Sequence, residues 1–398
     1  MGQVAGGREA NEAIWARAGR EVARMATRAV DRVRAGVTGR LAAGIAACLL
    51  AGAAVSACGG ITASPTARAS TPTASSSTAS AAPRSATPAP TAATSTPAAR
   101  TGSWSTAVSI DAGLDLVAVS CPSTTDCVAV DASSGGTATS GNALTYDGSS
   151  WSAPAPVDQP NSLVSISCPT AGFCAAVDSA GDALTYDGSS WTPFTGIDTV
   201  GQFEAVSCVS PSFCVAVDNS GNAYTFDGSA WSSPVQVDST EGILTSVSCT
   251  SPSFCAGVGG TGAFTFNGSS WSHATGLGTG EASGTGPPDG VSCASSSFCV
   301  AVGSNGGVYT YNGSSWSTRA DVDAIDGVSG GLTAVSCPTT SFCMAVDEDS
   351  NRSVMLSGSS WSAPLPASSG YGLEAVSCPS TSFCVAVDDN ADVLTWHS

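Results

Sequence analysis

Fourteen of the sixteen cysteines in this sequence fall into seven pairs with one spacing, and that spacing suits a disulfide. Two cysteines that flank a five-residue loop between antiparallel strands can face each other at the separation a disulfide needs. Structural zinc would need four convergent ligands, usually with a tighter C-x2-4-C spacing, and the chain has two histidines. We therefore predict structural disulfides and no metal. The pairs are Cys121 with Cys127, Cys168 with Cys174, Cys208 with Cys214, Cys249 with Cys255, Cys293 with Cys299, Cys337 with Cys343, and Cys378 with Cys384.

Catalytic chemistry has few candidates outside the carboxylates. No Ser-His-Asp set and no cluster of metal-binding histidines is visible, so nucleophilic and metal-assisted hydrolysis are not expected. A Glu/Asp pair of the kind glycosidases use stays open, because many carboxylates are present and their geometry is not visible in the sequence. We expect no enzyme activity, no catalytic residues and no cofactor.

The charge of the chain excludes nucleic acid as a partner. All 13 basic residues are arginines, and only Arg319 and Arg352 follow residue 100, against 22 Asp and 5 Glu in the same segment. Phosphate backbones are bound mainly through Lys and Arg, and a strongly acidic surface repels them.

A repeat of 40 to 45 residues runs through the chain from residue 102. Its markers are tryptophans at 151, 191, 231, 271, 316 and 361, with one cysteine pair between successive tryptophans. Each copy holds four short strand signals, which in the second copy are residues 149–157, 163–167, 174–177 and 183–187. Repeats of this length with four strands are typical of β-propeller blades.

The two ends of the array predict a closed ring of seven blades. The last copy stops at Ser398, before the strand that should follow its third strand, and residues 102–110 supply an unpaired copy of that strand. The N-terminal strand would complete the last blade and remove two exposed sheet edges. We predict an all-β, monomeric seven-bladed propeller over residues 102–398.

The segments YDGSSW (146–151 and 186–191) and FDGSAW (226–231) resemble the Asp-box of sialidase-type propellers, and VSC…FCVAVD resembles the photosystem-assembly propellers. The resemblance implies a turn between the third and fourth strands of each blade. Asp147, Asp187 and Asp227 would cap these turns, and the tryptophans would fill the core between blades. Sialidases use three arginines for the substrate carboxylate, whereas this segment has two.

Residues 1–57 have the order of a secretory signal, with arginines before the uncharged apolar run 41–57. The run ends in Val55-Ser56-Ala57-Cys58, which resembles the lipobox of secreted bacterial lipoproteins and implies cleavage before Cys58 and lipidation of its sulfur. An uncleaved anchor helix is the alternative. Met25 would give a conventional leader and is a possible true start. Residues 58–101, rich in Ser, Thr, Pro and Ala, are expected to be a disordered linker. The propeller would then lie at the extracellular face of the membrane, or be secreted.

The loops of unequal length predict a binding face. The connections from the second to the third strand and from the fourth strand to the next blade vary in length, whereas the other turns do not. Both variable connections open on one face of a propeller, and the longest are 131–142, 277–289 and 323–331. The candidate rim residues on this face, which could attract a cation or a basic partner, are Asp158, Asp178, Asp182, Asp198, Asp218, Asp238, Asp323, Asp326, Asp347 and Asp388.

Together these features predict a non-catalytic surface lipoprotein whose propeller binds or holds an extracellular protein or a cell-wall glycan. The alternatives are a lectin-like propeller with shallow carbohydrate sites between blades and, less favoured, a glycoside hydrolase.

Overall fold

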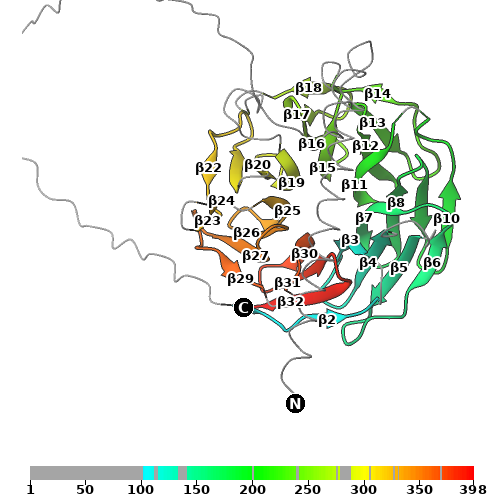
Figure 1. The fold of residues 1–398 in the computed structure, drawn as a ribbon. Helices are drawn as coiled ribbons and strands as arrows, with labels where there is room; N and C mark the ends of the chain where they lie inside the picture. The colour runs from blue at the N-terminus through cyan, green and yellow to red at the C-terminus, as the bar shows by residue number, and fades with distance from the viewer. Residues whose placement is uncertain are drawn as a thin grey trace, which may run out of the picture. The chain divides into compact units, whose positions relative to one another are not determined.

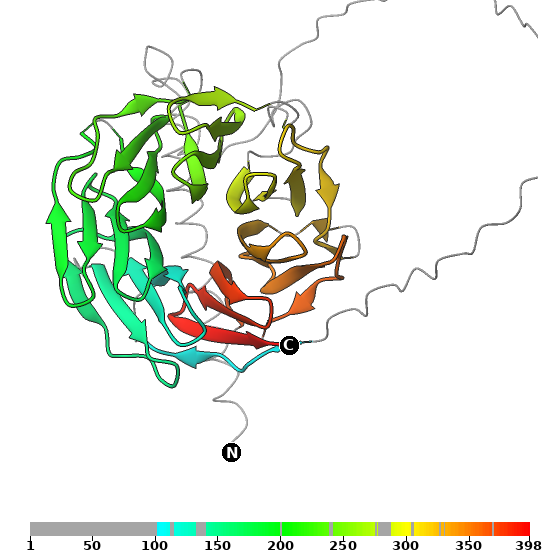
Figure 2. The ribbon, with the colours of Figure 1, turned by 180° about the vertical axis from the view of Figure 1, so that it is seen from behind.

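The chain forms a ring of seven antiparallel β-sheets, the blades of a β-propeller (Figures 1 and 2). This computed structural model describes residues 102–398 except 112–114, 133–140, 200, 239–241, 275–276, 278–287, 304–305, 326–327, 330 and 368–369. The predicted leader, Cys58 and linker lie outside the described residues. All of the regular elements in the described part are strands.

Each blade has four strands, and the first strands of neighbouring blades contact each other around the axis. Blade 1 comprises β3 (Asp115–Ser120), β4 (Cys127–Ala132), β5 (Gly141–Tyr146) and β6 (Ala155–Asp158), and blade 2 comprises β7 (Leu163–Thr170), β8 (Phe173–Asp178), β9 (Ala183–Tyr186) and β10 (Trp191–Phe194). Blade 3 comprises β11 (Phe203–Ser210), β12 (Phe213–Asp218), β13 (Asn222–Phe226) and β14 (Val235–Gln236). Blade 4 comprises β15 (Leu244–Ser251), β16 (Phe254–Gly259), β17 (Gly262–Phe266) and β18 (Trp271–His273).

Blades 5 to 7 follow the same plan, with the outer strand of blades 6 and 7 in two short pieces. Blade 5 comprises β19 (Pro288–Ser295), β20 (Phe298–Gly303), β21 (Gly307–Tyr311) and β22 (Ala320–Asp321). Blade 6 comprises β25 (Leu332–Thr339), β26 (Phe342–Asp347), β27 (Arg352–Ser357), β28 (Ser360–Trp361) and β29 (Leu365–Pro366). Blade 7 comprises β30 (Leu373–Ser380), β31 (Phe383–Asp388), β32 (Asp392–His397), β1 (Ser103–Trp104) and β2 (Val108–Ser109). A small hairpin, β23 (Ala324–Ile325) and β24 (Val328–Ser329), lies between blades 5 and 6 in the sequence.

The second strand of each blade is apolar along its length because neighbouring blades cover both of its faces. In β12 the five residues from Cys214 to Asp218 are all buried, and the other second strands follow this pattern closely. Alternation of apolar and polar residues is expected only where one face of a sheet meets water. The repeated phrase Cys-Val-Ala-Val-Asp is therefore the signature of a strand packed between two sheets.

A closed ring of hydrogen bonds joins the seven first strands and explains why serine precedes the first cysteine of each pair. The backbone N–H of each first cysteine donates to the hydroxyl oxygen of that serine in the preceding blade, as from Cys168 to Ser120 at 2.9 Å. The same bond recurs at all seven interfaces, and Cys121 to Ser377 at 2.9 Å closes the circle. A first cysteine lies next to a register shift in its strand in six of the blades, where a backbone N–H needs another acceptor.

The N-terminal strand closes the ring, as the sequence predicts. Trp104 pairs with Trp396 in β32, and the Ile110 N–H donates to the Ala391 carbonyl at 3.0 Å. The cyan β2 accordingly runs beside the red β32 in Figure 1. Seven clusters of buried apolar side chains each span two adjacent blades, including one between blades 7 and 1. An open array of seven blades would have six.

Candidate functional site

The propeller has two faces with different chemistry. We call one the hairpin face, made by the turns between first and second and between third and fourth strands. The loop face is the opposite one, made by the remaining connections. In blade 2 the pairs Leu163–Asp178 and Ala183–Phe194 lie at the loop face, whereas Tyr186–Trp191 lies at the hairpin face. Loops of unequal length therefore gather on one face, as predicted.

All seven predicted disulfides are present, on the hairpin side of the blades. Each joins the first and second strands of one blade, except that Cys121 directly follows its first strand, and the paired Cα atoms are 3.9–4.1 Å apart. Their number is typical of proteins in oxidising compartments. The bonds are Cys121 to Cys127, Cys168 to Cys174, Cys208 to Cys214, Cys249 to Cys255, Cys293 to Cys299, Cys337 to Cys343, and Cys378 to Cys384.

The second cysteine of every pair is buried more deeply than its place beside a surface turn suggests. Each begins or nearly begins the apolar second strand, where the neighbouring blades cover it, and is at most 1% exposed. A sulfur in this position is shielded from bulk solvent, which agrees with a structural role for the bond. The seven are Cys127, Cys174, Cys214, Cys255, Cys299, Cys343 and Cys384.

The aspartates of the Gly-Ser-Ser-Trp turns are structural caps, as predicted. Asp147 Oδ1 accepts hydrogen bonds from the Ser149 and Ser150 N–H groups at 2.9 and 2.8 Å and from the Ser149 hydroxyl at 2.7 Å. These bonds, the hydroxyl first, lower the pKa of Asp147 to about 2. Asp187 behaves in the same way, and hydrogen bonds also lower the pKa of Asp227. The Asp-box kinship itself stays a prediction.

The repeated tryptophans pack into the clusters between blades, also as predicted. Five of the six stand against the aromatic residue five positions earlier, as in Tyr186–Trp191, whose ring centroids lie 5.3 Å apart. In blade 6 the residue in that position is Leu356, which pairs with Trp361. Trp316 is buried, and Trp191 is half-buried against the cluster of blades 1 and 2.

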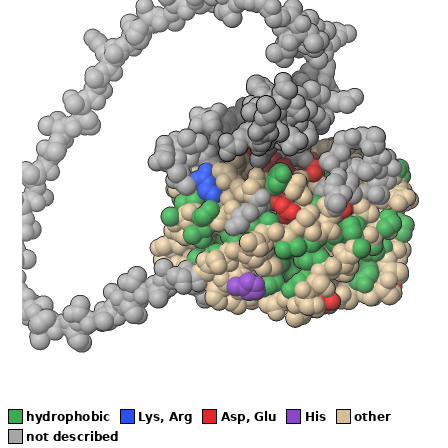
Figure 3. All heavy atoms as spheres, turned by 60° about the horizontal axis from the view of Figure 1, so that its bottom comes forward, with side chains coloured by type: hydrophobic (Ala, Val, Ile, Leu, Met, Phe, Trp, Pro, Cys, Tyr) green, Lys and Arg blue, Asp and Glu red, His purple; other side chains and the backbone are tan. Residues whose placement is uncertain are grey.

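The structure buries most of the predicted rim carboxylates at the loop face. Of the ten candidates, Asp158 and Asp182 are half-buried and Asp326 lies outside the described residues. The other seven are at most 3% exposed and therefore cannot form the contact surface of a macromolecule. Few acidic side chains are visible in the view of Figure 3. The buried seven are Asp178, Asp198, Asp218, Asp238, Asp323, Asp347 and Asp388.

The buried carboxylates meet in pairs across blade boundaries. One aspartate lies at or just after the end of the fourth strand of a blade, and the other lies at the end of the second strand of the next blade. The carboxyl group of Asp158 is a neighbour of that of Asp178, and the same holds for Asp111 with Asp131 and for Asp323 with Asp347. We call these three the carboxyl pairs. Asp198 and Asp218 occupy the same two positions between blades 2 and 3.

Each carboxyl pair holds a proton near neutral pH. Burial first, and then the neighbouring aspartate, raises the pKa of Asp158 to about 7 and that of Asp323 to about 7. Burial, countered in part by hydrogen bonds from Asn142, likewise raises the pKa of Asp131 to about 7. Two neighbouring carboxylates that are buried away from water resist being ionised together. Asp158 Oδ2 has no hydrogen-bond partner among the described residues. A proton shared between the two carboxyl groups would supply it with one.

Asp218 is held differently, by three donors of its own blade. Its oxygens accept from the Asn222 N–H and side-chain amide, each at 2.7 Å, and from the Tyr224 hydroxyl at 3.0 Å. Burial nevertheless raises its pKa. Among the described residues, no three His, Cys, Asp or Glu side chains are grouped so that they could hold a metal ion.

One residue of interest escaped prediction because it departs from the repeat. In six blades the residue before the second cysteine is phenylalanine, whereas blade 1 has Asp126. Asp126 is half-buried on the hairpin face and lines a cavity between blades 1 and 2. Alignment of the seven cysteine hairpins would have revealed it.

Comparison with solved structures finds propellers of the same architecture. One is YCF48 bound to D1 peptide, at 14% sequence identity and a TM-score of 0.56, with 74% of this chain and 95% of that chain covered. YCF48 from Cyanidioschyzon merolae matches at 14% identity and 0.56, covering 74% and 98%. A chain of the Mitotic Checkpoint Complex matches at 15% and 0.56, covering 82% and 99%. These identities show the fold alone. No family model and no curated protein matches the sequence. The described part of the chain has no helix long and apolar enough to span a bilayer.

Proposed function

We propose that this chain is a non-catalytic binding protein of the extracellular surface, anchored by lipid on Cys58, whose loop face docks a protein partner. The observation that carries the proposal is the asymmetry of the ring, in which uniform turns occupy one face and connections of unequal length occupy the other. Variable loops on a rigid scaffold are the usual place for recognition. The structure of YCF48 with a peptide offers a precedent for protein binding by this fold.

The burial of the acidic residues supports a non-catalytic role. A glycosidase needs two carboxyl groups that reach a sugar from opposite sides. Asp178, Asp323 and Asp347 are fully or almost fully buried against neighbouring blades, and Asp131 is too. Carboxyl groups in these positions are shielded from a substrate by the protein itself.

A capture experiment with variants on opposite faces tests the proposal. The soluble propeller, residues 101–398, would be used to capture partners from native cell envelope. Arginines at Ala180 and Asn390, exposed on the loop face, should abolish capture by adding bulk and positive charge. Arginines at Ala230 and Ser382, exposed on the hairpin face, are the matched control and should leave capture unchanged.

The proposal fails if the two double variants behave alike, or if the captured material is glycan without protein. Anchoring is tested separately on the full chain. Cys58→Ala should prevent both lipidation and cleavage, so that the variant keeps residues 1–57, whereas the unaltered protein should begin at a lipid-modified Cys58. Mass spectrometry that finds an unmodified Cys58 in the unaltered membrane-bound protein would contradict lipidation.

A further inference from the structure

At the hairpin face, an aromatic side chain fills six of the seven interfaces between blades. The interface between blades 1 and 2 lacks this side chain. The residue before the second cysteine sits at the tip of the inner hairpin of its blade, where it reaches toward the next blade. It is phenylalanine in six blades and Asp126 in blade 1; the six are Phe173, Phe213, Phe254, Phe298, Phe342 and Phe383.

In the six other blades the phenyl ring packs into or against the apolar cluster shared with the neighbouring blade. Phe173 stacks on Phe226 of blade 3 with ring centroids 6.3 Å apart and an interplanar angle of 20°. Phe254 stacks on Tyr311 of blade 5 at 6.1 Å and 25°. The partner is in each case the residue that pairs with the second cysteine of the next blade. In blade 2 that residue is Tyr186.

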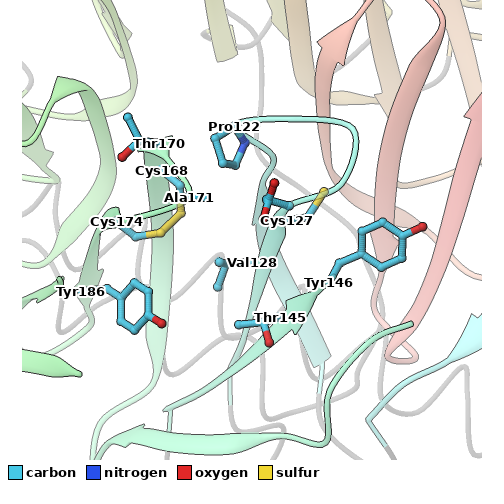
Figure 4. A pocket seen from close by; sticks show the side chains of 11 residues that line it. Pro122, Cys127, Val128, Thr145, Tyr146, Cys168, Thr170, Ala171, Cys174 and Tyr186 are labelled. Carbon is cyan, nitrogen blue, oxygen red and sulfur yellow. A yellow bond between two sulfur atoms is a disulfide. The ribbon is translucent and has the colours of Figure 1, made fainter. Parts of the chain in front are cut away.

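Between blades 1 and 2 the place of this ring is a cavity of about 180 Å³. Figure 4 shows its walls, with Pro122, Val128 and Thr145 on one side and Tyr186 and Thr170 on the other. We call it the slot.

The side chain of Asp126 does not fill the slot, because its own loop engages it. Asp126 Oδ2 accepts hydrogen bonds from the hydroxyls of Ser123 and Thr125 at 2.6 and 2.9 Å. The strand pairing also differs, since β3 ends at Ser120 while the first strands of the other six blades reach to within three residues of their phenylalanine.

We propose that the slot is a second binding site, which takes a phenylalanine or tyrosine side chain of a partner polypeptide with a basic group beside it. The size fits one ring, because benzene fits a cavity of roughly 150 Å³ and the slot has about 180 Å³. Its walls combine apolar side chains such as Pro122 and Val128 with the hydroxyl-bearing Thr145 and Thr170. The aromatic character follows from the six equivalent gaps, each of which takes a phenyl ring from the chain itself. The positive charge follows from Asp126, the one charged residue among those that line the slot.

The site is independent of the proposed function, because it lies on the opposite face from the variable loops. Its partner contributes a ring where this chain lacks one, so that binding completes the seventh interface. A half-buried carboxylate favours an adjacent cation over a neutral group by at most about five-fold. Because it also repels an anion, the preference for the cation over the anionic equivalent is about ten-fold.

The first test uses small probes that share one ring and differ in charge. Phenethylamine and phenylacetate would be titrated into the purified chain by ligand-observed NMR. We expect phenethylamine to bind about ten times more tightly than phenylacetate. Asp126→Asn, which keeps the shape, should remove this preference. Asp126→Phe, which supplies the missing ring, should abolish binding of both probes.

The second test uses the peptides acetyl-Gly-Phe-Lys-Gly-amide and acetyl-Gly-Leu-Lys-Gly-amide. We expect the first to bind, to compete with phenethylamine and to be lost in Asp126→Phe, and the second to bind at least ten-fold more weakly. Thermal unfolding of each variant shows whether it folds. If Asp126→Phe does not fold, Asp126→Asn still tests the role of the carboxylate.

Several results would overturn the proposal. If the probes still bind to Asp126→Phe, their ring binds at a place other than the slot. If the two probes bind with equal affinity, the Asp126 carboxylate does not select for positive charge. If phenethylamine binds and the Phe-Lys peptide does not, the slot does not take a side chain of a polypeptide. Capture of a partner by the loop face should be unaffected by Asp126→Phe, so the failure of either proposal leaves the other standing.

Discussion

Replacement of Trp104 by alanine tests whether the N-terminal strand locks the ring. Trp104 comes from the first described strand, yet its side chain lies between the last two blades and is 8% exposed. Its ring meets that of Trp396 edge to face, with centroids 5.8 Å apart. Its indole N–H donates to the hydroxyl of Ser353 in blade 6 at 2.9 Å. One side chain thus joins the start of the array to two blades at its end.

The expected cost follows from what the substitution removes. Truncation of a buried tryptophan to alanine costs about 3–5 kcal/mol, and the fully buried Ser353 hydroxyl loses its donor, which adds to the penalty. We expect the free energy of unfolding to fall by about 4–5 kcal/mol. In a domain of this size each kcal/mol corresponds to roughly 2 °C, so the melting temperature should drop by about 10 °C.

Trp191 provides the matched control. It belongs to the corresponding outer strand of blade 2 but is only half-buried, so Trp191→Ala should cost about half as much. Both variants would be unfolded in denaturant with the disulfides intact, and their free energies compared. The reasoning is refuted if Trp104→Ala costs less than about 1 kcal/mol, or no more than Trp191→Ala, because the N-terminal strand would then not hold the ring closed.

Three further predictions follow from the same geometry. The carboxyl pairs bind protons up to about pH 7, whereas unfolded aspartates release theirs near pH 4, so the free energy of unfolding should fall as pH rises from 4 to 7. We expect a melting temperature about 5 °C lower at pH 8 than at pH 5; calorimetry that shows a rise would contradict the pairing. Replacement of Cys208 and Cys214 by serine should cost about 2 kcal/mol with the fold kept, and alkylation of propeller cysteines in denaturant without reductant would argue against the disulfides. Asp126→Phe should raise the free energy of unfolding by about 1–2 kcal/mol, and a decrease would show that the slot differs from the six filled gaps.

The architecture was predictable because the chain repeats it. A constant spacing of six between paired cysteines fixes one hairpin per blade, and the count of pairs fixes the number of blades. The missing last strand and the extra first strand fix the closure. The register of Trp104 opposite Trp396 confirms that step. The hydrogen bonds from each first cysteine to the serine of the preceding blade were not foreseen, since they join equivalent residues of different copies.

The carboxylates lie on the predicted face, but their burial was not predicted, because the groups that cover them belong to a neighbouring repeat. A lone aspartate after a strand is usually a solvated turn residue, which led to the prediction of an exposed rim. Their partners lie across the blade boundary, twenty residues away in the cases of Asp111 with Asp131 and Asp158 with Asp178. That spacing is visible in the sequence, but only the stacking of blades shows that it brings two carboxyl groups together.

Comparison of the seven interfaces shows which contacts occur at every interface and which occur at only some of them. Between blades 4 and 5 the two carboxyl-pair positions are Leu277 and Gly303, and between blades 6 and 7 they are Ala367 and Asp388. The ring closes over these interfaces without an acidic pair, so the pairs are not what joins the blades. Buried ionisable pairs also add little stability. The pairs therefore make the loop-face ends of their interfaces respond to pH, while the serine–cysteine bonds and the apolar clusters, present at every interface, hold the ring together.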